Sequence, residues 1–302
     1  MADWSLGTDN TERLTEMIGE GIHSSNQSPH QYVQDEVPVG FFTDPTVCIG
    51  CKACEVACKE WNHVPADADP WTGLSYDNTK CLGASSWRHV LFLEESKPRG
   101  TQVAGPMGLD GEDPFRWVFL SDVCKHCEVA GCLESCPTGA IVRTETEAVY
   151  VQNDVCNGCG YCVVSCPFGV IDRRDDPLPD KGGAFKCTFC YDRQISGLVP
   201  ACAKACPTES IRFGPLRDLR REAEQRVATV RAQGYDDAQL YDPTDTSVGG
   251  LHAFFLLLGP PENYRLPPKP EVPTIYLTEA YGAALGTALL ALTFVLCVFN
   301  FL

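Results

Sequence analysis

The distribution of apolar residues separates a long mixed region from an uninterrupted apolar C-terminus. Residues 280–302 contain no charged side chain. At about 1.5 Å of rise per residue, a helix of this length crosses the hydrocarbon core of a bilayer. The pattern therefore predicts one transmembrane anchor helix over 275–302, with Tyr276 and Tyr281 at the membrane interface.

A second helix is predicted upstream of the anchor, over residues 215–233. Pro215 suits the first helical position and Gly234 suits the end. Apolar side chains recur on one face at helical spacing, and charged side chains occupy the other face. We expect residues 215–274 to comprise this bracing helix and a loop-like, proline-rich linker over 234–274. The apolar face consists of Leu216, Leu219, Ala223, Val227 and Val230.

The rest of the chain predicts short strands and loops. Strand-like patterns occur at 89–93, 115–120 and 148–151. The first two lie in an insertion over 61–120 that is rich in Trp, Gly, Pro and Asp. Residues 1–43 predict a polar N-terminal arm, and a tail that orders only on a partner surface is favoured over a short helix capped by Asn10. The first 40 residues show no apolar segment typical of a secretory signal.

Cysteine spacing changes this picture, because all of the 18 cysteines except Cys81 and Cys297 fall into four runs. The third run matches the bacterial ferredoxin pattern, in which the cysteine before proline ligates the neighbouring [4Fe–4S] cluster. Each run therefore needs a partner run, and four runs predict four clusters. The runs are Cys48-x2-Cys51-x2-Cys54-x3-Cys58, Cys124-x2-Cys127-x4-Cys132-x3-Cys136, Cys156-x2-Cys159-x2-Cys162-x3-Cys166 and Cys187-x2-Cys190-x11-Cys202-x3-Cys206.

An internal repeat follows three of these runs, in the form Cys-Pro-x3-Ile ending at Ile141, Ile171 and Ile211. Small ferredoxin modules have this plan, and they bury too little apolar area to fold without their clusters. The predicted fold is α+β: tandem bacterial-ferredoxin-like modules with four cubane clusters over 44–214, followed by one C-terminal transmembrane helix.

Two other interpretations of the cysteines are less favoured. Disulfide frameworks are typical of short secreted chains, and cysteines two or three residues apart have poor geometry for bridging. Structural zinc sites usually consist of two separated CxxC pairs rather than three close cysteines and a distant fourth before proline. We expect Cys81 to be a buried or capping thiol and Cys297 to be a lipid-buried or helix-packed one.

The remaining chemistry indicates a relay rather than an active site. The formal net charge of −16 excludes the basic footprint of a nucleic-acid-binding protein. The chain shows no nucleotide-binding glycine loop and no flavin, haem or molybdopterin signature. His126, between Cys124 and Cys127, is expected to have a surface role, and the alternative is that it tunes a cluster by hydrogen bonding. Such a chain is a subunit between an electron-donating and an electron-accepting partner.

The order of the runs resembles the four-cluster iron–sulfur subunits of molybdopterin oxidoreductases. The beta subunit of membrane-bound, N-type formate dehydrogenase is the most similar of these. The likeness is carried by Cys48-Ile-Gly-Cys-Lys-Ala-Cys54, by Cys156-Asn-Gly-Cys-Gly-Tyr-Cys162, and by the segment 223–252 with Gly249-Gly250-Leu251-His252. It extends over roughly residues 44–295 and includes the C-terminal anchor. The insertion after the first run and the N-terminal arm depart from the family pattern.

The resemblance implies which cysteines hold each of the four [4Fe–4S] clusters. Cys159 and its neighbours are all present, so four cubanes rather than a three-iron variant are expected. The implied sets are Cys48, Cys51, Cys54 and Cys206; Cys58, Cys187, Cys190 and Cys202; Cys124, Cys127, Cys132 and Cys166; and Cys136, Cys156, Cys159 and Cys162.

The resemblance also implies partners and a place in the cell. The outer runs would face a molybdenum- or tungsten-bis-pterin catalytic subunit. The inner runs would face an integral membrane quinone-reducing subunit of cytochrome b or polysulfide-reductase type. The anchor would lie in the cytoplasmic membrane, with the cluster domain on its outer face, although Arg265 and Lys269 before the anchor favour the opposite orientation. No nucleic-acid partner is expected.

Two alternative functions use the same clusters. One is the equivalent relay in a hydrogenase or in a polysulfide, tetrathionate or sulfoxide reductase complex. The other is a membrane-tethered polyferredoxin that donates electrons to various acceptors.

Overall fold

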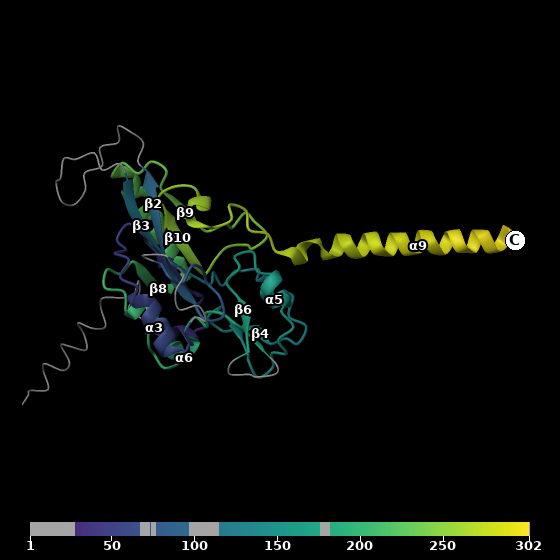
Figure 1. Cartoon of the computed structure of the whole chain (residues 1–302), viewed down its shortest axis with the longest axis horizontal. Helices are drawn as coiled ribbons and strands as arrows, with labels where there is room; N and C mark the ends of the chain where they lie inside the picture. The colour runs from purple at the N-terminus through teal and green to yellow at the C-terminus, as the bar shows by residue number, and fades with distance from the viewer. Residues whose placement is uncertain (1–27, 67–72, 74–76, 97–114, 176–181, 302) are drawn as a thin grey trace, which may run out of the picture.

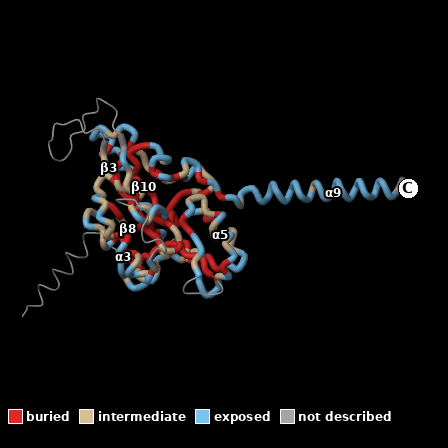
Figure 2. The backbone as a smooth tube through the Cα atoms, viewed as in Figure 1, coloured by how far each residue is buried: buried red, intermediate tan, exposed pale blue. Residues whose placement is uncertain are grey.

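The structure is a computed structural model that describes residues 28–66, 73, 77–96, 115–175 and 182–301. It consists of a body of mixed helices and mostly antiparallel strands, and a long C-terminal helix, α9 (Leu277–Phe301), that projects away from it (Figure 1). The helix is exposed along almost its whole length (Figure 2). Among the described residues, one span, Pro273–Phe299, is long and apolar enough to cross a membrane, with a mean hydropathy of 2.2.

A four-stranded sheet joins distant parts of the chain. Its order is β8 (Ile211–Pro215), β1 (Val39–Thr43), β10 (Ala253–Leu257) and β9 (Gln239–Tyr241). Strand β1 pairs in parallel with β10 and antiparallel with β8. Every residue of β1 and β10 is buried, as expected for central strands covered on both faces.

Two sequence expectations are wrong in this region. Within the predicted polar arm, residues 28–43 form α2 (Pro29–Gln34) and the buried strand β1, while residues 1–27 lie outside the described residues. The predicted linker contains β9 and β10, both of which belong to the sheet. The chain on either side of the cysteine runs therefore builds the core instead of only connecting it.

Helix α8 (Leu216–Ala232) confirms the predicted amphipathic helix. It follows Pro215, and Gly234 adopts a left-handed φ of 95° just after it ends. The expected apolar face is buried against the sheet, where α8 contacts β1, β8 and β9. Its buried residues are Leu216, Leu219, Ala223, Val227 and Val230.

Three hairpins complete the strands. The predicted strands of the insertion pair antiparallel as β2 (Arg88–Ser96) and β3 (Phe115–Val123), with Arg88 opposite Val123. The other pairs are β4 (Ile141–Arg143) with β5 (Val149–Val151) and β6 (Asp172–Arg174) with β7 (Gly183–Phe185).

The Cys-Pro-x3-Ile repeat precedes a strand each time it occurs. Ile141 begins β4, Ile211 begins β8, and Ile171 directly precedes β6. All three isoleucines are at most 4% exposed. The remaining helices are α3 (Ala53–Trp61), α4 (Gly131–Glu134), α5 (Tyr161–Val164), α6 (Tyr191–Ile195), α7 (Ala201–Lys204), η1 (Pro261–Tyr264) and η2 (Pro273–Tyr276).

Candidate metal centre

Each cysteine run begins with a C-x-x-C loop whose third residue has a left-handed backbone. These residues are Gly50, His126, Gly158 and Phe189, with φ between 44° and 71°. Glycine adopts this conformation freely, whereas His126 and Phe189 do so at a steric cost of about 1–2 kcal/mol each. The turn directs backbone N–H groups toward sulfur, and the N–H of Phe189 donates to Cys187 Sγ at 3.3 Å.

The later cysteines of each run sit on a single helical turn. Helices α4, α5 and α7 carry Cys132, Cys162 and Cys202, and the last cysteine of each run follows two residues after the helix. Helix α3 carries both Cys54 and Cys58. In every run these two thiols are four residues apart.

Set A consists of Cys48, Cys51, Cys54 and Cys206, which line one cavity. Cys206 comes from the fourth run, so the first and last runs meet here. Ser121 on β3 places its Oγ 3.3 Å from Cys54 Sγ. Burial raises the pKa of the Cys54 thiol to about 12, although the nearby Arg88 charge opposes this shift.

Set B consists of Cys58, Cys187, Cys190 and Cys202, all buried. Helices α3 and α7 pack together and bring Cys58 next to Cys202. Burial, followed by repulsion from Cys187, Cys202 and Cys190, raises the pKa of Cys58 well above its ordinary value. Asn62 places its Nδ2 3.8 Å from Cys58 Sγ and 3.9 Å from Cys190 Sγ.

Set C consists of Cys124, Cys127, Cys132 and Cys166, which line a second cavity together with Lys125, His126 and Lys186. Cys166 belongs to the third run and the other three to the second. Burial, followed by repulsion from Cys124, Cys166 and Cys132, raises the pKa of Cys127 well above its ordinary value. The loop is held by the segment at 248–252, because Glu128 and Val129 donate their N–H groups to the carbonyls of Gly250 and Val248 at 3.0 and 2.8 Å.

Set D consists of Cys136, Cys156, Cys159 and Cys162. Burial raises the pKa of Cys162 to about 11, and repulsion from Cys156, Cys159 and Cys136 adds to the shift. Cys159 is exposed, so this set reaches the surface on one side of the body. Its fourth thiol, Cys136, comes from the second run, just as set C takes Cys166 from the third run.

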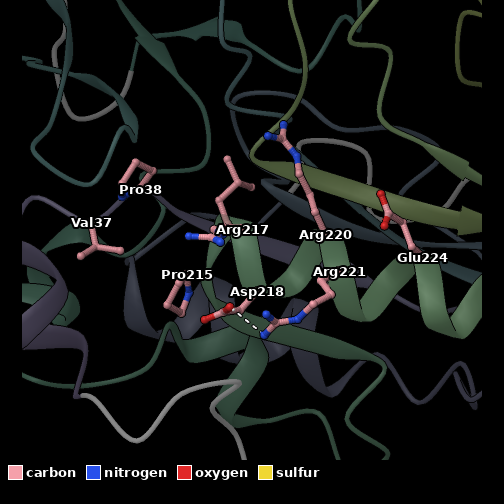
Figure 3. Close-up of a pocket in the computed structure, with 9 residues that line it drawn as sticks. Val37, Pro38, Pro215, Arg217, Asp218, Arg220, Arg221 and Glu224 are labelled. Carbon is pink, nitrogen blue, oxygen red and sulfur yellow. Dashed lines mark hydrogen bonds and ion pairs between the residues drawn. The ribbon is translucent and has the colours of Figure 1, made fainter.

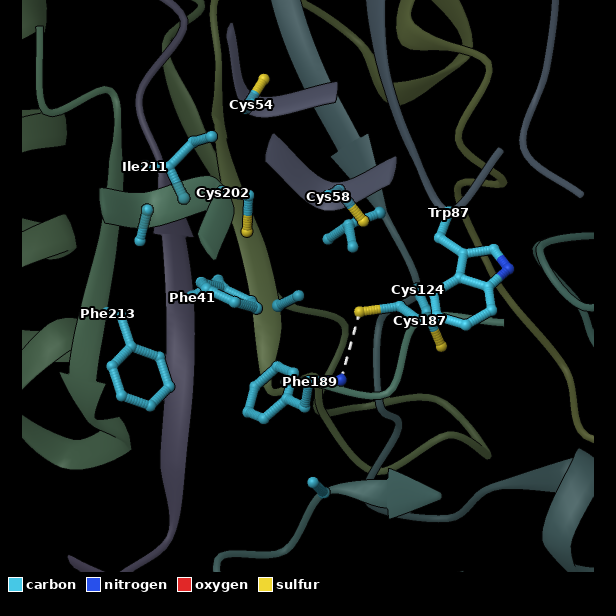
Figure 4. Close-up of a cluster of buried hydrophobic side chains, with 14 of the residues drawn as sticks. Phe41, Cys54, Cys58, Trp87, Cys124, Cys187, Phe189, Cys202, Ile211 and Phe213 are labelled. Atoms are coloured by element: carbon cyan, nitrogen blue, oxygen red, sulfur yellow. Dashed lines mark hydrogen bonds between the residues drawn. The ribbon is translucent and has the colours of Figure 1, made fainter. Parts of the chain in front are cut away.

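Neighbouring thiols connect the four sets in a series. Cys54 of set A interacts with Cys202 of set B, Cys187 of set B with Cys124 of set C, and Cys132 of set C with Cys162 of set D. The A–B–C part of this series can be followed in Figure 4, where Cys54, Cys202, Cys58, Cys124 and Cys187 lie along one side of Phe41 and Phe189. The thiols therefore form one connected path, A–B–C–D.

The chemistry of these sets fits iron–sulfur clusters. All 18 cysteines are free thiols, so no disulfide competes for them. Free thiolates are costly in such buried positions, whereas a metal-bound thiol is deprotonated by the metal itself. Within the described ranges, no three His, Cys, Asp or Glu side chains are close enough to hold a single metal ion.

Two expectations about single residues are wrong. Cys81 is exposed rather than buried. His126 is 1% exposed, accepts the Val149 N–H on Nδ1 at 3.1 Å and packs on Phe189 with the ring centroids 4.3 Å apart. Its Nε2 has no partner among the described residues, so this buried N–H is available to the metal centre.

Buried cations near the sets were not foreseen from the sequence. Arg88 and Lys186 are each 2% exposed and lie near thiols of sets A and B, and of sets B and C, respectively. Lys186 immediately precedes Cys187, and this position is a local signal in the sequence. No local signal marks Arg88, which begins an ordinary strand.

A surface hollow at the start of α8 has no part in this centre. It is lined by residues such as Val37, Arg217, Arg220 and Glu224, and it contains no cysteine (Figure 3). Arg221 is paired there with Asp218 at 2.9 Å.

Comparison with known proteins supports the cluster chemistry. Two overlapping segments, residues 47–140 and 115–216, match families described as 4Fe-4S dicluster domains. The chain is 38% identical to the formate dehydrogenase iron-sulfur subunit of Haemophilus influenzae over 254 residues, which cover 82% of this chain and 75% of the relative.

Two further relatives come from Escherichia coli. The formate dehydrogenase-O iron-sulfur subunit is 38% identical over 263 residues, covering 85% of this chain and 81% of the relative. The B subunit of anaerobic dimethyl sulfoxide reductase is 33% identical over 183 residues, covering 61% of this chain and 76% of the relative.

The fold, the clustered thiols and the domain matches define a ferredoxin-like protein that binds [4Fe–4S] clusters. Within that class, this protein belongs to the family of formate dehydrogenase iron–sulfur subunits.

Proposed function

We propose that this chain is the electron-transfer subunit of a formate dehydrogenase. It relays electrons one at a time from a pterin–metal catalytic subunit to a quinone-reducing subunit in the membrane. The observation that carries the proposal is the identity of 38% to such subunits over more than four-fifths of the chain. The chain has no catalytic site of its own in this proposal.

Sets A, B, C and D each hold one [4Fe–4S] cluster. When bound, each cluster exchanges single electrons, at a potential set by its charge, burial and hydrogen bonds. The closeness of Cys54 to Cys202, of Cys187 to Cys124, and of Cys132 to Cys162 supports the order A–B–C–D. The protein exposes Cys51 at one end of this order and Cys159 at the other.

Set D is the end that serves the membrane partner. Helix α4, which carries Cys132, packs against α5 of set D and against η2, the turn that leads into α9. Thr274 of this turn donates its hydroxyl to the Glu134 carboxylate. In Figure 1, α5 lies near the root of α9, whereas α3, which carries the set A residue Cys54, lies on the far side of the body.

Exposed apolar side chains flank the relay at both ends. Tyr161 and Val164 are 59% and 78% exposed near set D, and Ile49 and Val56 are 59% and 61% exposed near set A. Contiguous exposed apolar groups mark sites of protein contact. The set A surface contacts the molybdenum or tungsten subunit, and the set D surface contacts the quinone-reducing subunit of cytochrome b or polysulfide-reductase type.

Helix α9 anchors the chain in the cytoplasmic membrane by a single pass, with the cluster domain on the outer face. Its length, its apolar composition and its exposure outside the body support the anchor. Protease added to spheroplasts tests the sidedness. Digestion of the cluster domain supports the outer face, and complete protection contradicts it.

A second candidate is the same relay in a sulfoxide reductase. The similarity to the B subunit of anaerobic dimethyl sulfoxide reductase, at 33% identity, favours it. That match covers less of the chain than the formate dehydrogenase matches do, so formate dehydrogenase is the better-supported assignment.

Low-temperature EPR of the membrane complex distinguishes these functions. Samples are frozen after adding formate, after adding hydrogen, and after adding dithionite. Magnetically interacting [4Fe–4S]⁺ signals with formate alone are expected. Signals with hydrogen alone, or with dithionite alone, would contradict a formate dehydrogenase while leaving an electron relay in place.

A further inference from the structure

Arg88 occupies an unusual position for an arginine. It begins β2, is 2% exposed, and places its guanidinium 5.0 Å from the centroid of the Phe41 ring. Its Nη1 donates to Ser121 Oγ at 3.0 Å. Figure 4 shows Phe41 on the same side of the core as Cys202 and Cys58, and the charge of Arg88 interacts with thiols of both sets A and B.

Most of this guanidinium's hydrogen-bonding capacity is unused. Nε and Nη2, which carry three N–H bonds, have no partner among the described residues. The groups that interact with the charge of Arg88 are Cys202, Cys54, Cys187 and Cys58, one from set A and three from set B. A buried cation with free donors is costly, so it needs an anionic acceptor in the space that these thiols surround.

We propose that Arg88 bridges the clusters of sets A and B, donating N–H···S hydrogen bonds from Nε and Nη2 and raising the reduction potentials of both. This inference rests on the proposed ligand sets A and B. Arg88 acts through its charge and its donors and is not itself a ligand of iron.

The side chain suits this place better than lysine would. Guanidinium is planar, remains charged at any ordinary pH, and directs donors in several fixed directions, so one residue can reach two acceptors. Lys186, near sets B and C, already has acceptors for its ammonium, which donates to the carbonyls of Val149 and Cys187. Arg88, by contrast, is a buried cation with two nitrogens that have no partner among the described residues.

The hairpin of β2 and β3 positions the Arg88 guanidinium near sets A and B. In the β2–β3 register, Arg88 pairs with Val123, the residue before Cys124, and Val90 pairs with Ser121. The two strands thus hold the arginine and its serine partner at the start of the second run. This hairpin belongs to the 61–120 insertion and the strand that completes it, which gives that insertion a role in the relay.

The sign of the effect follows from charge. Reduction adds one negative charge to a cluster, and a nearby cation stabilises the reduced form more than the oxidised form. In Arg88→Gln, the equilibrium constant for reduction should fall about tenfold at the A and B clusters, or about 59 mV for one electron. The C and D clusters should change by less than about twofold. Arg88→Lys keeps the positive charge but loses the several fixed N–H donors of the guanidinium. The equilibrium constant for reduction is therefore expected to fall about threefold at the A and B clusters.

EPR-monitored redox titration of the purified complex, with mediators and dithionite, measures these constants without relying on formate turnover. Iron content is measured in parallel. Arg221→Gln is the matched control, because Arg221 is exposed on α8 and pairs with Asp218 at the surface. Its four potentials should equal those of the wild type.

The outcomes separate the two proposals. A fully loaded Arg88→Gln complex with wild-type potentials at A and B overturns the role of Arg88. If Arg88→Gln loses iron, the Arg88→Lys variant provides the test. A fully loaded Arg88→Lys complex with unchanged A and B potentials overturns the role of Arg88 in setting those potentials. Loss of clusters in both variants overturns it too. Failure of formate to reduce the wild-type clusters counts against the proposed function alone, since the titration still tests Arg88.

Discussion

Ser121 places its hydroxyl oxygen 3.3 Å from the sulfur of Cys54. The same oxygen accepts a hydrogen bond from Arg88, which leaves the hydroxyl proton free to point at the sulfur. Ser121 is 1% exposed, so water does not compete for this contact. The pair therefore connects strand β3 to set A by a hydrogen bond of the kind that tunes iron–sulfur potentials.

Ser121→Ala should lower the potential of the set A cluster most and leave the potentials of the set C and set D clusters unchanged. Loss of one O–H···S bond makes the electron-rich, reduced cluster less stable. A decrease of about threefold in the equilibrium constant is expected, or roughly 30 mV. Redox titration followed by EPR measures it, with the exposed Ser196→Ala as the control. Equal shifts in both variants would contradict the assignment.

Cys136→Ser should damage the cluster of set D, although Cys136 belongs to the run that supplies most of set C. Its neighbours in the structure are the set D thiols, as shown by its interaction with Cys162. Iron content should fall by about four atoms per chain, with loss of one EPR signal. The reciprocal variant, Cys166→Ser, should damage set C. Loss of set C in Cys136→Ser would refute the pairing.

Stability at alkaline pH should depend on Tyr241. Burial raises the pKa of this phenol above its usual value, and the hydroxyl donates to the Pro267 carbonyl at 2.6 Å. The folded chain therefore keeps a proton that the unfolded chain loses near pH 10. The unfolded state binds fewer protons above that pH, so stability falls as pH rises further, by about 1.4 kcal/mol per pH unit.

Tyr241→Phe removes this pH dependence and costs about 1 kcal/mol at neutral pH through the lost hydrogen bond. The rate of thermal bleaching of cluster absorbance between pH 8 and 11 reports both effects. Above pH 10, the bleaching rate of the wild type should rise more steeply with pH than that of the variant. Parallel pH profiles for the two proteins would show that this phenol does not titrate on unfolding.

Removal of iron should unfold the body but not the anchor. The cysteine runs consist of loops and short helical turns. The left-handed backbone of His126 and Phe189 has a steric cost that cluster binding would compensate. In contrast, α9 satisfies its backbone hydrogen bonds internally and remains helical in detergent. Limited proteolysis with circular dichroism, before and after chelation, measures both parts. A protease-resistant body without iron would contradict this prediction.

The cysteines of the four sets were predictable because cysteine spacing is a local property. A C-x-x-C loop and a following helical turn have the same geometry in every run, so residue numbers alone identify the thiols. Helix α8 was equally accessible, since its apolar face repeats at a period that only a helix matches. The anchor follows from the absence of charge over a length that spans a bilayer.

The central sheet could not be obtained in this way. Strands β1 and β10 are buried on both faces, so they lack the alternation that identifies a strand, and Phe41 pairs with Ala253 from the other end of the chain. The burial of His126 and the exposure of Cys81 likewise depend on which distant segments cover them.

Arg88 shows the same limit at the metal centre. In the sequence it is one charged residue at the edge of an apolar strand. Its role at the metal centre depends on the side chains packed around it, which include Phe41, Ser121 and thiols from two runs. Local spacing thus specifies which thiols are available to iron, whereas packing between distant segments sets the charge and the dielectric surroundings in which the clusters work.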